Sequence, residues 1–340
     1  MRAQLNVGVI STGLVTSVGN SAESSCAAIR AKISNPWRSR FLDADGSWIM
    51  GHRVALVDDW QGTPRLVKFA EMAITDCLAD IPREEWATLP LILCVAESTR
   101  PGRFDDLEAP LLGEIMGALD TKFATQSTVL PRGRMGVCVA LAQARRLISD
   151  GVYPRVLIAA VDSIWNGQTL EHLENNGRLL TRRNSNGFMP GEGGGAILVG
   201  SESDSTSLIC AGIGFAVETS SIDSEEPLRA DGLTQAHRNA LLEANCQMHD
   251  INFRIADLSG EQYYFKEADL ALSRLLRIRQ EDPELWHPAE CVGECGAVSG
   301  AICISVAKAA IDKKYSPGRR ILLHFGDDAG DRASLIVMQR

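Results

Sequence analysis

A chain of 340 residues with 45% hydrophobic and 23% charged side chains is long enough to bury a large core, and this composition excludes intrinsic disorder. The formal net charge of −9 argues against a nucleic acid or an anionic membrane as partner, since both require clustered Lys and Arg. No apolar run approaches the ~18 residues of a membrane helix, and the N-terminus lacks the pattern of a signal peptide. We therefore expect a cytoplasmic protein that binds neither nucleic acid nor membrane.

Cysteine usage agrees with that compartment. The chain has nine cysteines, an odd number, and most of them lie inside apolar segments. Buried reduced thiols are typical of cytoplasmic proteins. Cys291 and Cys295 form a C-x-x-x-C pair, but no second Cys or His pair stands near them to complete a tetrahedral zinc site. We expect no metal and no cofactor.

Strand and helix patterns alternate along the first 200 residues. Residues 4–10 alternate and are rich in Val and Ile, which predicts a strand that Ser11, Thr12 and Gly13 break. Helices are predicted at 22–32, 65–79 and 137–149, and buried strands at 89–96, 155–161 and 195–200. Nearly continuous apolar strands of this kind are covered by helices on both faces.

The order begins again after the polar stretch 201–207, which we interpret as a turn or a linker. The patterns predict a strand at 208–217, a helix at 233–245, a strand end at 255–260, helices at 266–278 and 297–312, and a closing hairpin from RILLHFG and SLIVMQ. Two successive β/α halves, 1–205 and 206–340, imply helices on both sides of two sheets or of one wide sheet.

Several segments, in the same order over nearly the whole chain, resemble the β-ketoacyl-acyl carrier protein synthases, a branch of the thiolase-like superfamily. They are the opening VGVISTGLVTSVGN with its following helix, GVYPRVLIAAVDS, and NSNGFMPGEGGGAILVGS, which is the most specific match. The resemblance implies an α/β thiolase-like fold of two similar halves in five α/β/α/β/α layers, with an acyl-pantetheine pocket between the halves. It also implies a dimer in which the strand RVLIAAV lies beside its twin and continues the sheet. Because the chain is shorter than a typical synthase, we expect parts that cover the acyl tunnel to be missing.

The GEGGG segment contains Glu192 and Gly193. Glycine-rich segments of this kind also occur as flexible loops or phosphate-binding turns. No strand-to-helix unit follows Gly195, so we interpret the glycines as sites of close backbone packing beside the pocket. Glu192 is then expected to be a structural centre of hydrogen bonds.

The nucleophile position of the resembled family is a cysteine at a tight turn that opens a buried helix, where the helix N-terminus lowers the thiol pKa. Matching the helix that exits at Asp150-Gly151 places Gly133, Arg134, Met135 and Gly136 at this turn. Arg134 cannot attack a thioester because its guanidinium stays protonated. Cys138 lies one helical turn further on, where we expect a buried core cysteine.

The two catalytic histidines of the family also have no counterpart here. The segment RIADLSGE matches the first histidine motif with Asp257 at its centre, and VGECGAVSG matches the second with Glu294 in place of the histidine. Those histidines donate hydrogen bonds to the thioester or enolate oxygen. Ionised carboxylates would repel the developing negative charge instead.

A fourth element departs from the family pattern near Phe325 and Gly326. There the family has a glycine-rich loop whose backbone N–H helps to bind an oxyanion, whereas this chain has Asp327 and Asp328. His324 stands beside this loop. The other histidines fall outside the motifs, and we expect each to be a surface residue or to be bonded locally.

These departures predict a ketosynthase-like protein that has lost condensing activity and acts as a partner, scaffold or accessory subunit. We expect a homodimer, or a heterodimer with another ketosynthase-like protein, that contacts acyl carrier protein or acyl-CoA. One alternative is an acyltransferase or hydrolase in which Asp257 or Glu294 is a general base. Another is a condensing enzyme, a 3-oxoacyl synthase, whose nucleophile is Cys138.

The charges at these positions make a structural prediction as well. Arg134 is expected to form ion pairs with Glu294, Asp257 or both, because each charge alone in a buried pocket would be costly. The alternative is that Arg134 points through the pocket mouth into solvent.

Overall fold

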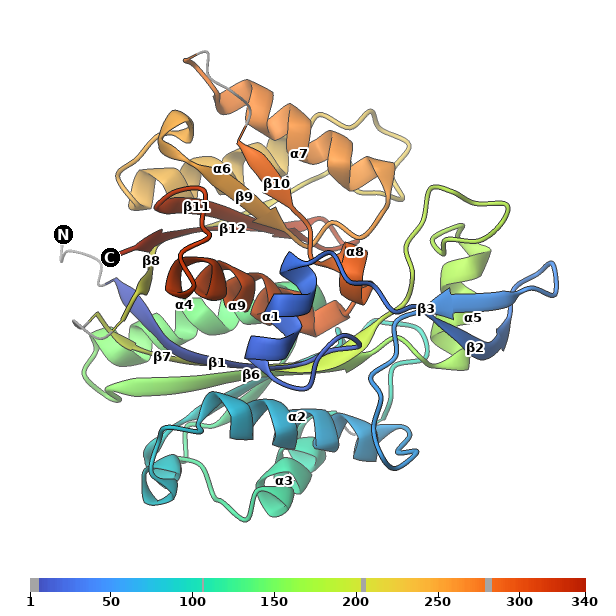
Figure 1. Ribbon diagram of the computed structural model, residues 1–340. Coiled ribbons are helices and arrows are strands. Elements are labelled where there is room, and N and C mark those ends of the chain that lie inside the picture. Colours follow the sequence, from blue (N-terminus) through green and yellow to red (C-terminus); the bar gives the residue numbers. More distant parts are fainter. Residues whose placement is uncertain (1–5, 106, 203–205, 279–282) are drawn as a thin grey trace.

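The computed structural model describes residues 6–105, 107–202, 206–278 and 283–340. Within them, one sheet of ten strands folds into two five-stranded layers, as Figure 1 shows. The layers are joined by only three residue pairs, in which Val7 to Val9 face Cys210 to Leu208. The sheet is therefore continuous in hydrogen bonding but divided in shape.

The two layers have the same topology. The first has the order β5-β4-β6-β7-β1 and the second the order β10-β9-β11-β12-β8, with matching parallel and antiparallel pairs. Their bounds are β1 (Val7–Val15), β4 (Leu91–Val95), β5 (Thr128–Pro131), β6 (Arg155–Ser163) and β7 (Glu192–Ser201), then β8 (Leu208–Val217), β9 (Phe253–Ala256), β10 (Glu284–Trp286), β11 (Arg320–Gly326) and β12 (Asp331–Gln339). The chain thus folds as two similar halves.

Helices fill the space between the two sheet layers and cover both outer faces (Figure 1). The inner helices are α1 (Ala22–Arg30), α4 (Gly136–Ser149) and α9 (Ser299–Asp312); α2 (Thr63–Cys77) and α3 (Ala109–Ala118) cover the first layer, and α6 (Asp231–Glu243) and α7 (Gln262–Leu275) cover the second. This arrangement confirms the predicted α/β/α/β/α layering of a thiolase-like fold.

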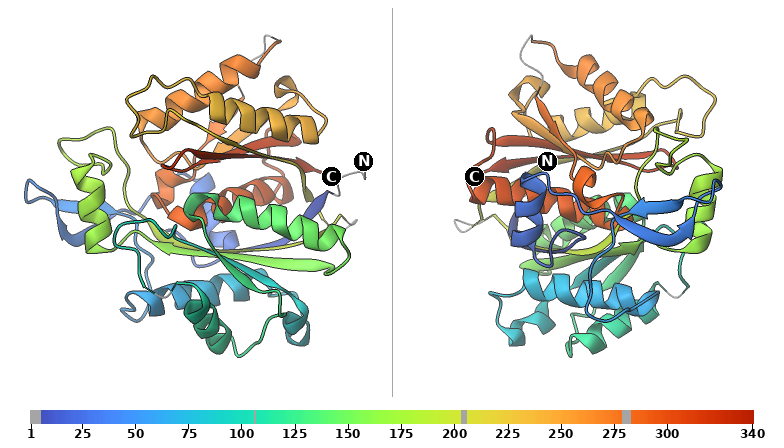
Figure 2. Two further views of the ribbon diagram at one scale, coloured as in Figure 1. Left: turned by 180° about the vertical axis from the view of Figure 1, so that it is seen from behind. Right: turned by 45° about the vertical axis from the view of Figure 1, so that its right-hand side comes forward.

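Smaller elements complete the fold. They are β2 (Trp37–Leu42), β3 (Trp48–Gly51), α5 (Gly167–Asn175), α8 (Ala289–Val292) and the 3-10 turns η1 (Arg83–Thr88), η2 (Gly133–Met135), η3 (Met248–Asp250) and η4 (Gly296–Val298). Both views in Figure 2 show the β2–β3 hairpin beside α5, projecting from one end of the layers. Among the described helices, none is both long and apolar enough to cross a bilayer.

The core has a compartment between the sheets and a further one between each sheet and its outer helices. Along β6, Ile158 and Ala160 face the inner compartment, whereas Leu157 and Ala159 face the outer one. Every residue of β6 after Arg155 is buried. This is why the strand has a continuous apolar sequence rather than an alternating one.

The first strand is longer than its sequence predicted. Instead of ending at Ser11, β1 passes an irregularity in register between Val9 and Ser11 and pairs with β7 as far as Val15. Gly13 allows α2 to approach, since a Cβ there would lie 2.0 Å from the carbonyl oxygen of Ala73. The glycine that looked like a break is a close-packing position. The first residues of the predicted strand and part of the 201–207 segment lie outside the described residues.

The expectation that β6, with the sequence RVLIAAV, forms the edge beside a twin strand was wrong. β6 is hydrogen-bonded to β4 on one side and to β7 on the other, so it has no free edge. In the described part of this layer, the outer strand is the short β5. After α4, the chain enters the sheet as β6 between β4 and β7, and not at the edge of the sheet.

Close packing at Gly13 makes a prediction for stability. Gly13→Ala should lower the free energy of unfolding by roughly 1–3 kcal/mol, because the added methyl overlaps the backbone of α2. Urea unfolding measures the change. The matched control is Gly113→Ala in α3, where a Cβ meets nothing within 4 Å and the helix should gain up to about 1 kcal/mol. Equal effects of the two substitutions would contradict the packing role of Gly13.

Candidate functional site

Two tight turns of the same kind meet between the sheets, one in each half. η2 opens α4 after Gly133, whose φ is 48°, and η4 opens α9 after Gly296, whose φ is 54°. Glycine suits these left-handed conformations. A carboxylate lies close to each turn: a Cβ would fall 2.2 Å from Glu97 at Gly133 and 2.0 Å from Asp162 at Gly296. Both turns are therefore fixed by close contact.

Arg134 projects from the first turn into a buried cluster of charges. Its Nη2 donates to Asp328 Oδ1 at 2.7 Å and to the hydroxyl of Tyr264 at 2.9 Å. Its Nη1 lies 3.6 Å from Glu294 Oε2, and its side chain is 11% exposed. The expected contact with Glu294 is present, and Arg134 does not point into solvent.

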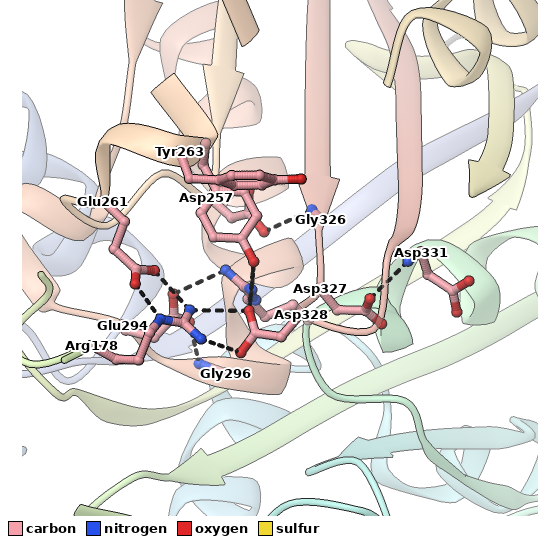
Figure 3. Close-up of polar contacts among 12 residues, drawn as sticks. Arg178, Asp257, Glu261, Tyr263, Glu294, Gly296, Gly326, Asp327, Asp328 and Asp331 are labelled. Atoms are coloured by element: carbon pink, nitrogen blue, oxygen red, sulfur yellow. Dashed lines mark hydrogen bonds and ion pairs between the residues drawn. The ribbon is translucent and has the colours of Figure 1, made fainter. Parts of the chain in front are cut away.

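Asp328 is the carboxylate that joins the two arginines of this cluster. It accepts from Arg178 at 3.0 and 3.1 Å and from the Tyr264 hydroxyl at 2.5 Å, and Figure 3 shows it on the turn after β11, facing Arg178. Arg178 also donates to both oxygens of Glu261. Although burial acts to raise the pKa of Asp328, Arg134 and Arg178 hold it well below its usual value. Asp328 is thus a firmly ionised carboxylate.

Asp257 lies at the end of β9 in a different environment. Its Oδ2 accepts from the backbone N–H of Gly326 at 3.2 Å, and no described cation lies within 4.0 Å of it. Burial raises the pKa of Asp257 to about 7, with the charge of Glu294 adding to the effect and Arg134 opposing it. Near neutral pH this carboxyl is therefore partly protonated.

Glu294 connects Arg134 with the second turn. Its Oε1 accepts from the N–H of Gly296 at 2.9 Å and from Ser299 Oγ at 3.4 Å. Burial raises the pKa of Glu294, and Arg134 opposes this shift. Glu294 therefore caps the turn that opens α9 while its other oxygen faces the guanidinium.

The arrangement limits what this site can do to an acyl thioester. Arg134 carries no nucleophilic lone pair. The N–H of Gly326, at the end of β11, donates to Asp257 and is not directed at an empty position. Donors for a developing oxyanion must point to where the negative charge forms. Here the nearby donors are engaged by carboxylates.

Cys138 does not have the surroundings of a nucleophile. It lies in the core with 0% exposure, on the first turn of α4. Burial raises the pKa of its thiol well above the usual value, and Asp257 adds to the shift. A reactive cysteine requires the opposite shift and access to solvent.

Glu192 begins β7 and makes several buried hydrogen bonds. It accepts from the N–H of Val54 at 2.9 Å, from Arg65 Nε at 2.9 Å and from Ser163 Oγ at 2.9 Å. Gly193 follows in the same strand, where a Cβ would lie 2.4 Å from the carbonyl oxygen of Val15. This segment is a strand that packs closely against β1, not a phosphate-binding turn.

The histidines lie away from the charged cluster. His324 packs on the outer side of β11 against His237 of α6, with ring centroids 5.4 Å apart, and burial lowers its pKa well below the usual value. His52, His237 and His324 are all buried, and neither ring nitrogen of His324 has a hydrogen-bond partner among the described residues. Of the histidines expected to be at the surface or bonded locally, His52 and His237 are buried, and each has a serine hydroxyl near one ring nitrogen, at 3.4 and 2.7 Å.

Three residues of the cluster were missed by sequence reasoning: Arg178, Glu261 and Tyr264. Arg178 follows α5, and the other two lie at the start of α7. Their contacts span large sequence separations, such as 150 residues between Arg178 and Asp328. The available signal was an arginine before the apolar pair Leu179-Leu180 and a glutamate two residues before a pair of tyrosines, which is weak on its own.

No protein-family model matches the sequence, and a search of curated proteins found no match. Among the described residues, no group of three His, Cys, Asp or Glu side chains is placed to hold a metal. All nine cysteines are free thiols.

Solved structures do match the fold. The ishigamide ketosynthase/chain length factor aligns with a TM-score of 0.78 at 16% identity, covering 99% of this chain and 100% of that one. A ketosynthase in complex with its chain length factor from Xenorhabdus doucetiae aligns with a TM-score of 0.75 at 11% identity, over 100% and 99%. A type II polyketide ketosynthase, AntDE, solved with its acyl-carrier protein, aligns with a TM-score of 0.80 at 14% identity, over 99% and 100%. The chain thus has the fold of ketosynthases and chain length factors.

The Arg134 cluster makes a prediction for stability. Arg134→Ala should lower the free energy of unfolding by roughly 3–5 kcal/mol, because the buried Glu294 would then lose its partner cation and Asp328 would keep only Arg178. The control is Arg183→Ala, since Arg183 is 82% exposed in its pair with Asp45 and should change stability by less than about 1 kcal/mol. Urea unfolding of both variants tests this, and a similar small loss in each would contradict the buried cluster.

Asp257 gives a prediction for pH dependence. Its pKa is raised from the ordinary 3.8 to about 7, so the folded chain holds the proton more tightly than the unfolded chain. This stabilisation is complete below the unfolded pKa and is lost as the pH rises to about 7. Asp257→Asn removes the titration, so its stability relative to the wild type should rise by about 1 kcal/mol or more between about pH 5 and pH 7.5.

Denaturant unfolding at both pH values measures this difference. Asp58→Asn, at an exposed position, is the matched control and should keep a constant offset from the wild type. An offset for Asp257→Asn that does not change with pH would show that Asp257 is not a buried, titrating carboxyl.

Proposed function

We propose that this protein is a ketosynthase-like subunit without condensing activity, which acts as a partner, scaffold or accessory protein. The observation that carries the proposal is the buried arginine at the turn that opens α4, bound to Asp328 and Glu294. A condensing site needs a nucleophile and hydrogen-bond donors at the reacting thioester. This cluster offers a protonated guanidinium and several carboxylates instead.

The neighbours in fold suggest the kind of partner. In two of them a ketosynthase is found with a chain length factor, and in a third a ketosynthase is in complex with an acyl-carrier protein. We propose that this chain forms a homodimer or a heterodimer with another ketosynthase-like protein. Acyl carrier protein or acyl-CoA is the further contact that we propose. Light scattering at micromolar concentration measures the mass of the assembly.

We also propose a reducing compartment such as the cytoplasm, because the cysteines of the chain are free thiols.

A second candidate function rests on Asp257. Burial raises the pKa of this carboxyl to about 7, which is close to the value that suits a general base at neutral pH. An acyltransferase or hydrolase of acyl thioesters could use it to activate water or an alcohol. The hydrogen bond from Gly326 to Asp257 would have to break for the oxyanion to use that N–H.

The proposal predicts no Claisen condensation by the isolated protein. With acyl and malonyl thioesters, CO2 release and chain elongation should stay at the level without protein. Arg134→Cys should not restore activity, because the carboxylates of Asp257 and Glu294 cannot replace donor histidines. Elongated product from the wild type would refute the loss of condensing activity.

The same substrates separate the alternatives. Release of free thiol from acyl-CoA by the wild type, lost in Asp257→Asn but kept in Asp58→Asn, would favour the hydrolase or acyltransferase. Stoichiometric labelling of Cys138 by a thiol-reactive acyl analogue would instead favour a condensing enzyme. We expect neither result.

A further inference from the structure

A second site lies at the end of the molecule where the β2–β3 hairpin stands beside α5 (Figures 1 and 2). A cavity of about 660 Å³ opens there, between the hairpin, the segment that follows β3 and the start of α5. Its volume lies within the range of roughly 300–1,000 Å³ found for small-molecule sites. Its lining does not include Arg134, Asp257, Glu294 or Asp328.

Aromatic side chains form much of the cavity wall. Four of the six tryptophans in the chain line it: Trp37, Trp48, Trp60 and Trp165. Trp37 is 50%, Trp48 40% and Trp60 43% exposed. Tryptophan is highly buried on average, so three partly exposed indoles at one cavity offer flat apolar surface to a ligand.

The charged residues of the lining are strongly unbalanced. Arg38, Arg40, Arg53 and Arg65 line the cavity, against Glu192 alone. This excess of positive charge stands out in a chain of net charge −9.

Two of these arginines are already neutralised. Arg65 is buried against Glu192 at the floor, and Arg53 lies 2.8 Å from Asp59. Among the described residues, Arg38 and Arg40 have no carboxylate within 4.0 Å. These two arginines therefore carry the uncompensated charge of the cavity.

The aromatic residues hold these two guanidinium groups in place. The guanidinium of Arg38 lies 4.5 Å from the ring centroid of Trp48, across the hairpin. Arg40 donates to Gln61 at 3.1 Å and lies 5.4 Å from the Phe41 ring. Stacking of this kind leaves the edge of a guanidinium free to bind an anion.

The start of α5 adds a third favourable feature. Asn166, the N-cap, and Gly167, the first helical residue, line the cavity. The N-terminal end of a helix carries partial positive charge. This partial charge adds to the positive charge of the arginines and favours an anionic ligand.

We propose that this cavity binds a small organic anion, a carboxylate or a phosphate ester, attached to a flat aromatic or conjugated body. Arg38 and Arg40 would bind the anionic group, since a guanidinium fork matches the oxygens of carboxylate and phosphate alike. The indoles would stack on the flat body. The inference is independent of the proposed function, because it uses no residue of the Arg134 cluster.

Isothermal titration calorimetry of the full chain tests the ligand class with five probes. 2-Naphthoate and 1-naphthyl phosphate carry both features, 2-naphthalenemethanol has the ring without the charge, and acetate and inorganic phosphate have the charge without the ring. We expect the two charged naphthalenes to bind at least about tenfold more tightly than the alcohol or the small anions. The ratio of the dissociation constants of 2-naphthoate and 1-naphthyl phosphate distinguishes a carboxylate site from a phosphate site.

Substitutions locate the binding. Arg38→Gln combined with Arg40→Gln should weaken the charged naphthalenes at least about tenfold and leave the alcohol unchanged. The double lysine variant, Arg38→Lys with Arg40→Lys, should retain part of the affinity because it keeps the charge. Arg238→Gln, an exposed arginine on α6, is the matched control and should bind as the wild type does.

Three outcomes would overturn the proposal. The neutral alcohol could bind as tightly as the acids, or the double glutamine variant could bind them as the wild type does. In the third outcome, calorimetry detects no binding of any probe, and light scattering shows that the double glutamine variant forms a smaller assembly than the wild type. That last result would identify the cavity face as an interface between copies of this chain.

Discussion

The constraint on which the site depends is the permanent charge of Arg134. A guanidinium does not lose its proton at any ordinary pH, so burying it between two sheets requires carboxylates within reach. Asp328 and Glu294 meet that requirement, and both come from the second half of the chain, whereas Arg134 and Arg178 come from the first. The cluster therefore holds the two halves together between the turns that open α4 and α9.

The carboxylates around Arg134 are not equivalent, and their positions explain why. Asp328 receives two arginines and a tyrosine hydroxyl, so its pKa is held low although its side chain is only 44% exposed. Asp257 receives one backbone N–H, and burial raises its pKa to about 7. One carboxylate thus supplies fixed negative charge, while below about pH 7 the other avoids the cost of a buried charge by holding a proton.

Local patterns predicted much of the fold because strand and helix periods are local properties. The strand at 208–217 and the helix at 137–149 are found at or within one residue of their expected bounds. The contact of Arg134 with Glu294 was also predicted, because either charge alone in one buried pocket would be costly. The place of β6 in the sheet and the contact of Arg178 with Asp328 could not be predicted. Each depends on which distant segments become neighbours, and no sequence period contains that information.

Hydrogen bonds at the end of β6 help to fix the geometry of the turn before α9. Asp162 accepts from the N–H of Ala297 at 2.8 Å and from Arg100 at 2.7 Å, so it caps the turn before α9. Ser163, the next residue, donates to Glu192 at the floor of the aromatic cavity. Each of these buried polar groups needs a hydrogen-bond partner regardless of which residue occupies position 134. Leaving one unpaired would lower the stability of the fold by about 1–3 kcal/mol. The scaffold of the site is thus stabilised by its hydrogen bonds, independently of any reaction.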